Sequence, residues 1–156
     1  MHISTFQVVL RLILATILGG SLGLERQFHG KVAGFRTYSA VALGGALIMI
    51  VSLQIALVYR IPSTDPSRIA AQVVSGIGFL GAGAIIRLSH GSQEVITGLT
   101  TAAGLWVSGG IGLACGLGLY FAAIFATILM IVIFLVLSKV DQIVGRKKAG
   151  SKSETP

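Results

Sequence analysis

The stretch that decides the fold is residues 95–137, which read VITGLTTAAGLWVSGGIGLACGLGLYFAAIFATILMIVIFLVL and contain no charged side chain. A transmembrane helix needs about 20 mostly apolar residues to cross a hydrocarbon core about 30 Å thick. This stretch is about twice that length, so it predicts two crossings joined by a tight turn at residues 114–116. One long kinked segment is the alternative.

The composition of the whole chain supports a membrane environment. Of its 156 residues, 54% are hydrophobic and 11% are charged, and the mean hydropathy is +0.90. A soluble domain carries about 25% charged residues, and a small globule is mostly surface. Lipid must therefore be the solvent for most of the chain. Helices are expected, because open strands leave backbone groups unsatisfied in lipid.

Three more apolar runs precede this stretch, each close to the length of one crossing. They lie at residues 5–24, 38–59 and 69–86, with polar segments at 25–37, 60–68 and 87–94. The first run does not resemble a signal peptide, because no positive charge precedes it and Arg11 interrupts it. We predict an all-α polytopic transmembrane bundle of about five helices in residues 1–138, with helices at 95–114 and 116–137.

The positive charges predict the orientation of this bundle. Nine of the twelve Lys and Arg residues flank the runs on the side of the C-terminus, two lie on the opposite side, and Arg11 lies inside a run. Cytoplasmic loops carry the excess of Lys and Arg, which places the N-terminus outside and the C-terminus in the cytoplasm. We expect residues 139–156 to form a disordered basic tail that binds anionic lipid rather than nucleic acid, since no soluble basic face is present.

Glycines are frequent in the third and fourth runs. Residues 76–81 read GIGFLG, which matches a dinucleotide-binding pattern, but that pattern requires a strand-to-helix turn exposed to water. Helix packing is the better interpretation, because small residues allow helices in lipid to approach closely. The third and fourth runs are therefore predicted to form the packed centre, and the fifth to face lipid. The predicted packing residues are Gly76, Gly78, Gly81, Gly83, Gly104 and Ser108.

Polar residues near the outer ends of the runs form a predicted outer polar cluster. Arg11 lies six residues past the start of the first run, or roughly 9 Å deep in a helix. Its side chain could extend to the interface, or it could pair with Asp65, with Gln72 completing the hydrogen bonds. The cluster comprises Arg11, Asp65, Arg68 and Gln72.

A predicted inner polar cluster lies at the cytoplasmic ends. Ordinary interfacial charge explains most of its members, and threonine hydroxyls commonly bond to their own helix. Glu94 precedes the fourth run, where a carboxylate complements the helix dipole. The cluster comprises Glu25, Arg26, Arg36, Glu94, Thr97, Thr100 and Thr101.

The sequence provides no recognisable catalytic, metal or cofactor site. Its five acids are Glu25, Asp65, Glu94, Asp141 and Glu154, and none is expected near the bilayer midplane, where ion pathways place such groups. The single Cys115 excludes an internal disulfide and a cysteine-based zinc site. We therefore predict no catalytic residue, no bound metal and no cofactor.

Three segments resemble the MgtC/SapB family of bacterial membrane proteins. They are GSLGLER at residues 20–26 followed by GFRT at 34–37, DPSRIAAQVVSGIGFLGAGAI at 65–85, and GLTTAAGLW at 98–106. The resemblance extends over about residues 10–137, and Arg11 lies where the family has an arginine before its first glycines.

The resemblance implies a multi-pass protein of the bacterial inner membrane, linked to growth at low magnesium and, in pathogens, to survival in host cells. It also implies restraint of the F-type ATP synthase, with direct magnesium transport as the older idea. Some family members carry a soluble C-terminal domain, and we expect this chain to be a short member without it.

We therefore predict a non-enzymatic protein that modulates another membrane complex or ion homeostasis. The alternative is a transporter or channel for Mg²⁺ or another ion, in oligomeric form, and purely structural membrane packing is a third interpretation. Membrane lipids, a membrane complex such as the F-type ATP synthase and further copies of the chain are the expected partners, and nucleic acid is not.

Overall fold

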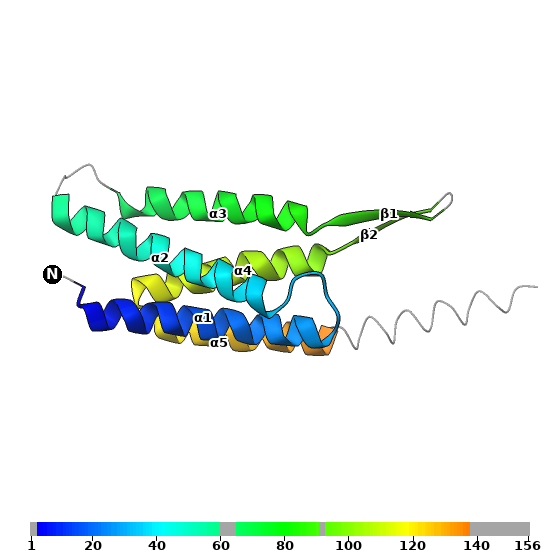
Figure 1. Cartoon of the computed structure of the whole chain (residues 1–156), viewed down its shortest axis with the longest axis horizontal. Coiled ribbons are helices and arrows are strands. Elements are labelled where there is room, and N and C mark those ends of the chain that lie inside the picture. The colour runs from blue at the N-terminus through cyan, green and yellow to red at the C-terminus, as the bar shows by residue number, and fades with distance from the viewer. Residues whose placement is uncertain (1–2, 60–64, 91–92, 138–156) are drawn as a thin grey trace, which may run out of the picture.

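The computed structural model describes residues 3–59, 65–90 and 93–137. The described chain forms five α-helices, one β-hairpin and a short terminal π-helix (Figure 1). In order these are α1 (Thr5–Phe28), α2 (Phe35–Tyr59), α3 (Pro66–Gly83), β1 (Ile86–His90), β2 (Gln93–Thr97), α4 (Leu99–Leu117), α5 (Tyr120–Val132) and η1 (Ile133–Leu137). The predicted basic tail at 139–156 lies outside the described residues.

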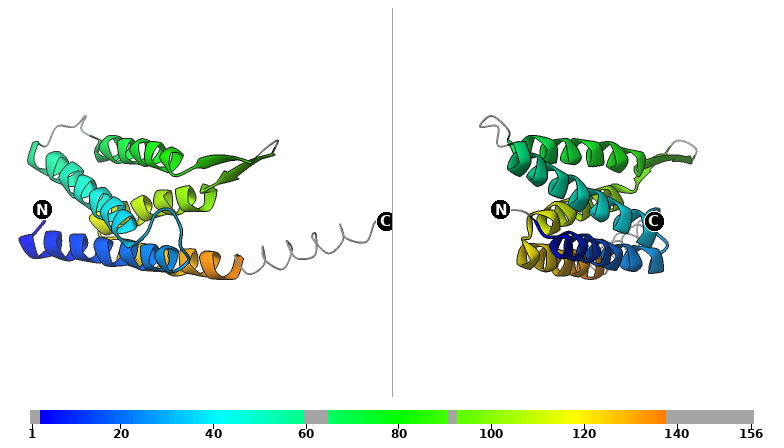
Figure 2. Two further views of the ribbon diagram at one scale, coloured as in Figure 1. Left: turned by 45° about the vertical axis from the view of Figure 1, so that its right-hand side comes forward. Right: turned by 60° about the vertical axis from the view of Figure 1, so that its left-hand side comes forward.

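The helices are arranged in three layers, and successive helices run in alternating directions. Helices α2 and α4 lie in the middle, with α3 on one side and α1 with α5 on the other (Figures 1 and 2). Within the described residues, α1, α2 and α4 are long and apolar enough to cross a membrane, and Tyr120–Val136 forms a shorter apolar helix. The predicted transmembrane bundle is therefore confirmed. Which terminus faces the cytoplasm stays a prediction.

The helix ends follow from local sequence signals. Ser4 and Gln7 form a capping box at the start of α1, with each side chain bonded to the backbone of the other. Gly118, in the left-handed region at φ +88°, ends α4 and is followed directly by Leu119 and α5. The prediction of two helices is therefore confirmed, and the alternative of one kinked segment is wrong. The turn at 114–116 was predicted too early, because Gly116 continues the helix and the left-handed turn is made by Gly118.

The polar segment predicted at 87–94 is a β-hairpin rather than a loop. Strands β1 and β2 pair antiparallel, with Ile86 opposite Thr97 and His90 opposite Gln93. The hairpin extends beyond the helices at one end of the bundle (Figure 1). Helix α4 consequently begins at Leu99 and not at residue 95. Two β-rich runs separated only by Gly91 and Ser92 are a recognised hairpin signal, which the helical interpretation overlooked.

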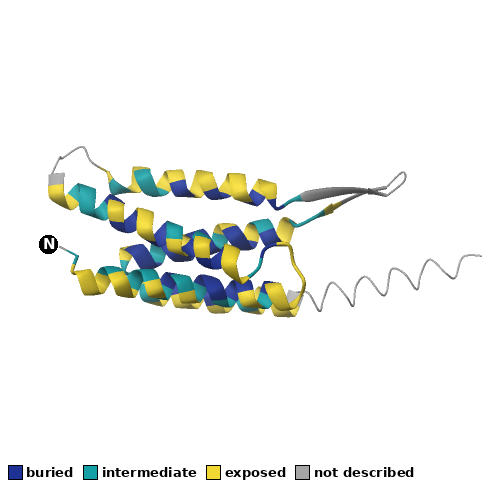
Figure 3. Ribbon diagram, viewed as in Figure 1, coloured by how far each residue is buried: buried dark blue, intermediate teal, exposed yellow. Residues whose placement is uncertain are grey.

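The packed centre of the bundle is formed by α1, α2 and α4. Helix α4 buries nine residues, among them Leu105, Ser108 and Ile111. Helix α3 buries only Val73, Ile77 and Gly81, and most of its surface is exposed (Figure 3). The prediction of a centre made by the third and fourth runs was therefore right for α4 and wrong for α3, because α3 packs on one side only.

Close backbone approach explains where the glycines of the centre lie. A Cβ on Gly19 of α1 would lie 2.6 Å from the Cβ of Ala42 in α2, and a Cβ on Gly116 would lie 2.6 Å from the Cβ of Met49. A Cβ on Gly112 would meet the carbonyl oxygen of Ala42. These glycines allow α1 and α4 to lie directly against the backbone of α2, which is how helices associate in lipid.

Candidate functional site

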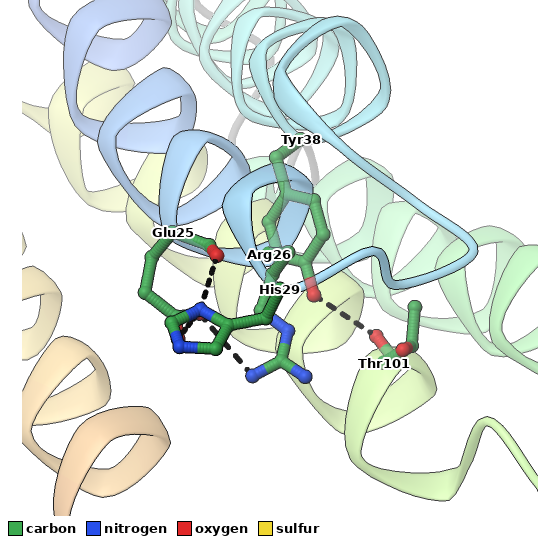
Figure 4. A network of polar contacts seen from close by, with 5 residues as sticks. All are labelled: Glu25, Arg26, His29, Tyr38 and Thr101. Atoms are coloured by element: carbon green, nitrogen blue, oxygen red, sulfur yellow. Dashed lines mark hydrogen bonds and ion pairs between the residues drawn. The ribbon is translucent and has the colours of Figure 1, made fainter.

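A network of charged and aromatic side chains closes the end of the bundle where α1 meets α2 (Figure 4). The Nη1 atom of Arg26 lies 3.2 Å from Oε2 of Glu25, and Nδ1 of His29 lies 3.0 Å from the other carboxylate oxygen. The Glu25 side chain is only 10% exposed. One carboxylate thus bridges the Arg26 cation in the last turn of α1 and the C-cap residue His29.

Arg26 is almost fully buried in this network. The residue is 5% exposed, and its Cζ atom lies 4.2 Å from the centre of the Phe134 ring in η1. An arginine over an aromatic face gains a favourable cation–π interaction, which is stronger when water is excluded. The Glu25 carboxylate and the Phe134 ring compensate in part for burying this charge, although the buried Nε has no hydrogen-bond partner among the described residues. They also connect α1 to the end of the chain's last described helix.

Tyr38 extends the network into α4. Its hydroxyl donates to the Thr101 carbonyl at 3.3 Å, and its own carbonyl accepts from Ser108 Oγ at 2.9 Å. A Cβ on Gly104 would meet the Tyr38 hydroxyl and the Phe134 ring, so this glycine provides the space that both rings occupy. The contacts join α1, α2, α4 and η1 at one end of the bundle.

The structure brings together part of the predicted inner polar cluster. Glu25 and Arg26 pair directly, and Thr101 takes part through its backbone. Arg36 and Thr100 are exposed, Thr97 is half-buried, and the side chain of Glu94 lies outside the described part. Sequence reasoning missed His29, Tyr38 and Phe134. The spacing of four between Glu25 and His29 was a usable signal, whereas no local pattern indicated the two aromatic residues.

The outer polar cluster does not form as predicted. Both carboxylate oxygens of Asp65 are engaged by Ser67, one by its amide and one by its hydroxyl, each at 2.8 Å. These bonds, the hydroxyl first, lower the pKa of the exposed Asp65 carboxyl, with a smaller effect from the Arg68 charge. Arg11 donates instead to the Gly116 carbonyl at 2.6 Å. The Arg11–Asp65 pair was therefore wrong, because Asp65 acts as the N-cap of α3.

Gln72 and Arg68 of the predicted outer cluster are both exposed on α3. Gln72 lines a cavity of about 660 Å³ between α2 and α3, here called the α2–α3 groove. Its α2 wall is formed by Thr37, Ala40, Val41, Gly44, Gly45 and Ile48, and its α3 wall by Ile69, Gln72, Val73, Gly76, Ile77 and Leu80.

The predicted packing residues divide between the groove, the exposed surface and the centre. Gly104 and Ser108 pack in the centre of the bundle, as expected. A Cβ on Gly81 would lie 3.6 Å from Ala102, which is an ordinary van der Waals separation. A Cβ on Gly76, Gly78 or Gly83 would meet no heavy atom within 4 Å, so these three predictions were wrong for packing inside the chain. Gly76 instead lines the α2–α3 groove.

These features define a multi-pass membrane protein whose helices pack over glycine, with a buried arginine network at one end and an open groove between two helices. Comparison with known sequences identifies the group. The MgtC family profile matches residues 12–143, and the chain belongs to the MgtC family. The resemblance seen in the three motif segments is thereby confirmed. No solved structure matches the chain.

Several curated relatives are similar over most of this chain. A protein of Haemophilus influenzae Rd, named "Uncharacterized protein", is 44% identical over 141 residues, which cover 88% of this chain and 58% of the relative. "Putative magnesium transporter YhiD" of Escherichia coli K12 is 44% identical over 132 residues, with 83% and 60% covered. "Protein MgtC" of Salmonella typhimurium LT2 is 40% identical over 149 residues, with 96% and 60% covered. The chain spans about three fifths of the length of these relatives.

Proposed function

We propose that this chain is a non-enzymatic protein of the bacterial inner membrane that serves magnesium homeostasis by holding a transmembrane helix of another membrane complex in the α2–α3 groove. The groove is the observation that carries the proposal. It opens on the outer surface of the bundle, where Gly76 and Leu80 are exposed, and Gly44 lines its opposite wall. Small residues on both walls permit the close backbone approach by which helices associate in lipid.

The connection to magnesium is supported by the relative from Escherichia coli, which is named "Putative magnesium transporter YhiD". The family resemblance supports the F-type ATP synthase as the complex that is bound. A protein that restrains this enzyme would act through protein contacts, and the exposed groove offers such a contact without requiring an ion to pass through the chain.

Transport of Mg²⁺ by the chain itself is the competing function, and the name of the same relative favours it. Mg²⁺ is bound by near-octahedral oxygen ligands and dehydrates reluctantly. The two carboxylates whose side chains the structure describes are already engaged, Glu25 by Arg26 and His29, and Asp65 by Ser67. Both lie at helix ends. Their engagement favours the helix-binding function.

The experiment compares two glycines of α3 that have the same open surroundings but different positions. Gly76 lines the groove and Gly78 does not, and a Cβ on either would meet nothing within 4 Å. Gly76→Ile should fill the groove, whereas Gly78→Ile should add an exposed side chain. Tagged variants are purified from bacterial membranes grown at low magnesium, and the co-purifying membrane complex is quantified. We expect Gly76→Ile to lose most of the complex and Gly78→Ile to retain it.

Equal retention by both variants would reject the groove as the binding surface. The transport alternative is measured separately, as Mg²⁺ flux into proteoliposomes under an imposed gradient and membrane potential. Flux that depends on the wild-type protein and disappears in Thr100→Val would reject the helix-binding function in favour of a channel, because Thr100 offers an exposed oxygen near the start of α4.

A further inference from the structure

A second cavity lies at the opposite end of the bundle from the buried arginine network. It has a volume of about 420 Å³ and is bordered by Arg11 and Gln7 of α1, the last part of α2, the first residue of α3 and Leu117 of α4. We call it the Arg11 pocket. Its volume falls within the range of about 300–1,000 Å³ that is typical of small-ligand sites.

Arg11 enters this region with most of its hydrogen-bonding capacity unused. Its Nη1 atom donates to the Gly116 carbonyl in the last turn of α4, while its buried Nε has no hydrogen-bond partner among the described residues. A guanidinium group has five N–H donors arranged for planar acceptors. A Cβ on Gly118 would lie 3.0 Å from Nη2, so the turn after α4 leaves space for the guanidinium.

The chain offers Arg11 no neutralising carboxylate in its described part. Asp65 directly precedes Pro66, which borders the pocket, but it forms no ion pair with Arg11, and Ser67 donates to both of its oxygens. Glu25 pairs with Arg26 at the far end of α1, and Glu94 belongs to the hairpin that extends from that same end (Figure 1). The carbonyl of Gly116 is a favourable acceptor at a helix C-terminus but leaves the net charge unchanged. A cation within a membrane protein is normally paired.

The remaining walls of the Arg11 pocket are apolar. Leu53 and Leu57 of α2 and Leu117 of α4 line it. The pocket therefore combines one cationic fork and one amide, that of Gln7, with an apolar surface. Arginine binds phosphate through paired N–H···O bonds, and the leucines would accommodate a hydrocarbon or glycerol portion.

We propose that the Arg11 pocket binds a phosphate oxyanion, with the Arg11 guanidinium as its cationic partner. Two sources share this chemistry: the headgroup of an anionic phospholipid, and free phosphate. The apolar walls fit the phospholipid, while free phosphate would use only the polar side of the pocket. In either case the ligand connects α1 to the ends of α2 and α4.

The test uses the full chain in detergent, with phosphatidylglycerol, diacylglycerol and inorganic phosphate as probes. Diacylglycerol shares the acyl chains and lacks the phosphate. Bound lipid is counted by native mass spectrometry, and thermal unfolding is followed in parallel. The wild type should prefer phosphatidylglycerol over diacylglycerol by about tenfold or more, as expected for charge-assisted hydrogen bonds, and should unfold at a higher temperature in its presence.

Two variants with matched controls decide the outcome. Arg11→Gln should reduce the preference severalfold, to what the basic tail contributes, whereas Arg36→Gln, at an exposed arginine, should leave it unchanged. Ala56→Phe should block the pocket while leaving Arg11 in place, and Ala122→Phe, on the exposed face of α5, should have no effect. The Ala56 variant remains decisive if Arg11→Gln does not fold.

Stabilisation by inorganic phosphate alone, lost in the same two variants, would assign the site to free phosphate. A preference as large as that of the wild type in Arg11→Gln or Ala56→Phe would overturn the proposal.

Discussion

Helices α3 and α4 carry similar patterns of small residues but bury them to different extents. Gly104, Gly109, Gly112 and Gly116 of α4 are all buried, whereas Gly81 is the one buried glycine of α3 (Figure 3). Helix α4 lies among α1, α2, α3 and α5, while α3 contacts chiefly α2 and α4. A pattern of small residues can therefore indicate either a helix–helix contact within the chain or a surface that no other helix of the described chain covers.

The difference has a physical reason that is specific to lipid. Apolar side chains lose nothing by facing lipid, so there is no hydrophobic drive that forces a small-residue face to be covered. The exposed small residues of α3, Gly76 beside the groove and Gly78 away from it, can therefore remain uncovered in the isolated chain. In water a comparable exposed apolar surface would indicate a binding site or a liability for aggregation. In this protein it is consistent with a binding surface beside α2.

The largest expected effect is on the amount of folded protein, and it should differ between glycine substitutions in α4 and in α3. Gly112→Leu places a side chain against the backbone of Ala42, whereas Gly78→Leu adds one where no heavy atom lies within 4 Å. Overpacking costs about 1–3 kcal/mol or more, and a rigid backbone cannot move aside. We expect Gly112→Leu to lose most of the folded protein in detergent, measured by size-exclusion chromatography, and Gly78→Leu to behave as the wild type. Equal losses would mean that α3 also packs on its outer face.

A smaller effect, on the free energy of unfolding, is expected when a serine on each of the same two helices is replaced by alanine. Ser108 of α4 is fully buried and donates to the Tyr38 carbonyl at 2.9 Å, while Ser75 of α3 is exposed. Ser108→Ala should reduce the free energy of unfolding by about 0.5–1.5 kcal/mol, the usual value of one such hydrogen bond. Ser75→Ala should change it by less than about 0.5 kcal/mol. Thermal unfolding in a single detergent measures both, and a cost at Ser75 equal to that at Ser108 would contradict the comparison.

Length and hydropathy were sufficient to predict the bundle, because each membrane crossing needs about 20 mostly apolar residues whatever their exact sequence. The β-hairpin was missed because its residues were assigned by polarity alone, and the pairing of Ile86 with Thr97 depends on the two residues between the strands. The turn at Gly118 was misplaced by a few residues, since several glycines nearby could each have adopted a positive φ.

The candidate sites were less predictable because they depend on which helices meet. Asp65 and Arg11 lie near the same end of the bundle, as expected, but the Ser67 amide, in the N-cap bond, and the Ser67 hydroxyl both donate to the Asp65 carboxylate. Such side chain to backbone bonds within a few residues compete effectively with long-range pairing. The contact of Arg26 with Phe134 joins residues far apart in the sequence, and no spacing rule indicates it.

The smallest effect concerns Gly81, where α3 does approach α4. A Cβ there would lie 3.6 Å from Ala102, an ordinary van der Waals separation, so alanine fits without displacement. Gly81→Ala and Gly78→Ala should therefore change the unfolding temperature of the isolated chain equally. Alanine is favoured over glycine in helices by up to about 1 kcal/mol, so both changes should be neutral or slightly stabilising. If a helix bound in the α2–α3 groove displaced α3 toward α4, the added methyl group of Gly81→Ala would oppose that displacement. Gly81→Ala would then weaken co-purification of the partner while Gly78→Ala would not, and equal co-purification would show that α3 keeps its position when the groove is filled.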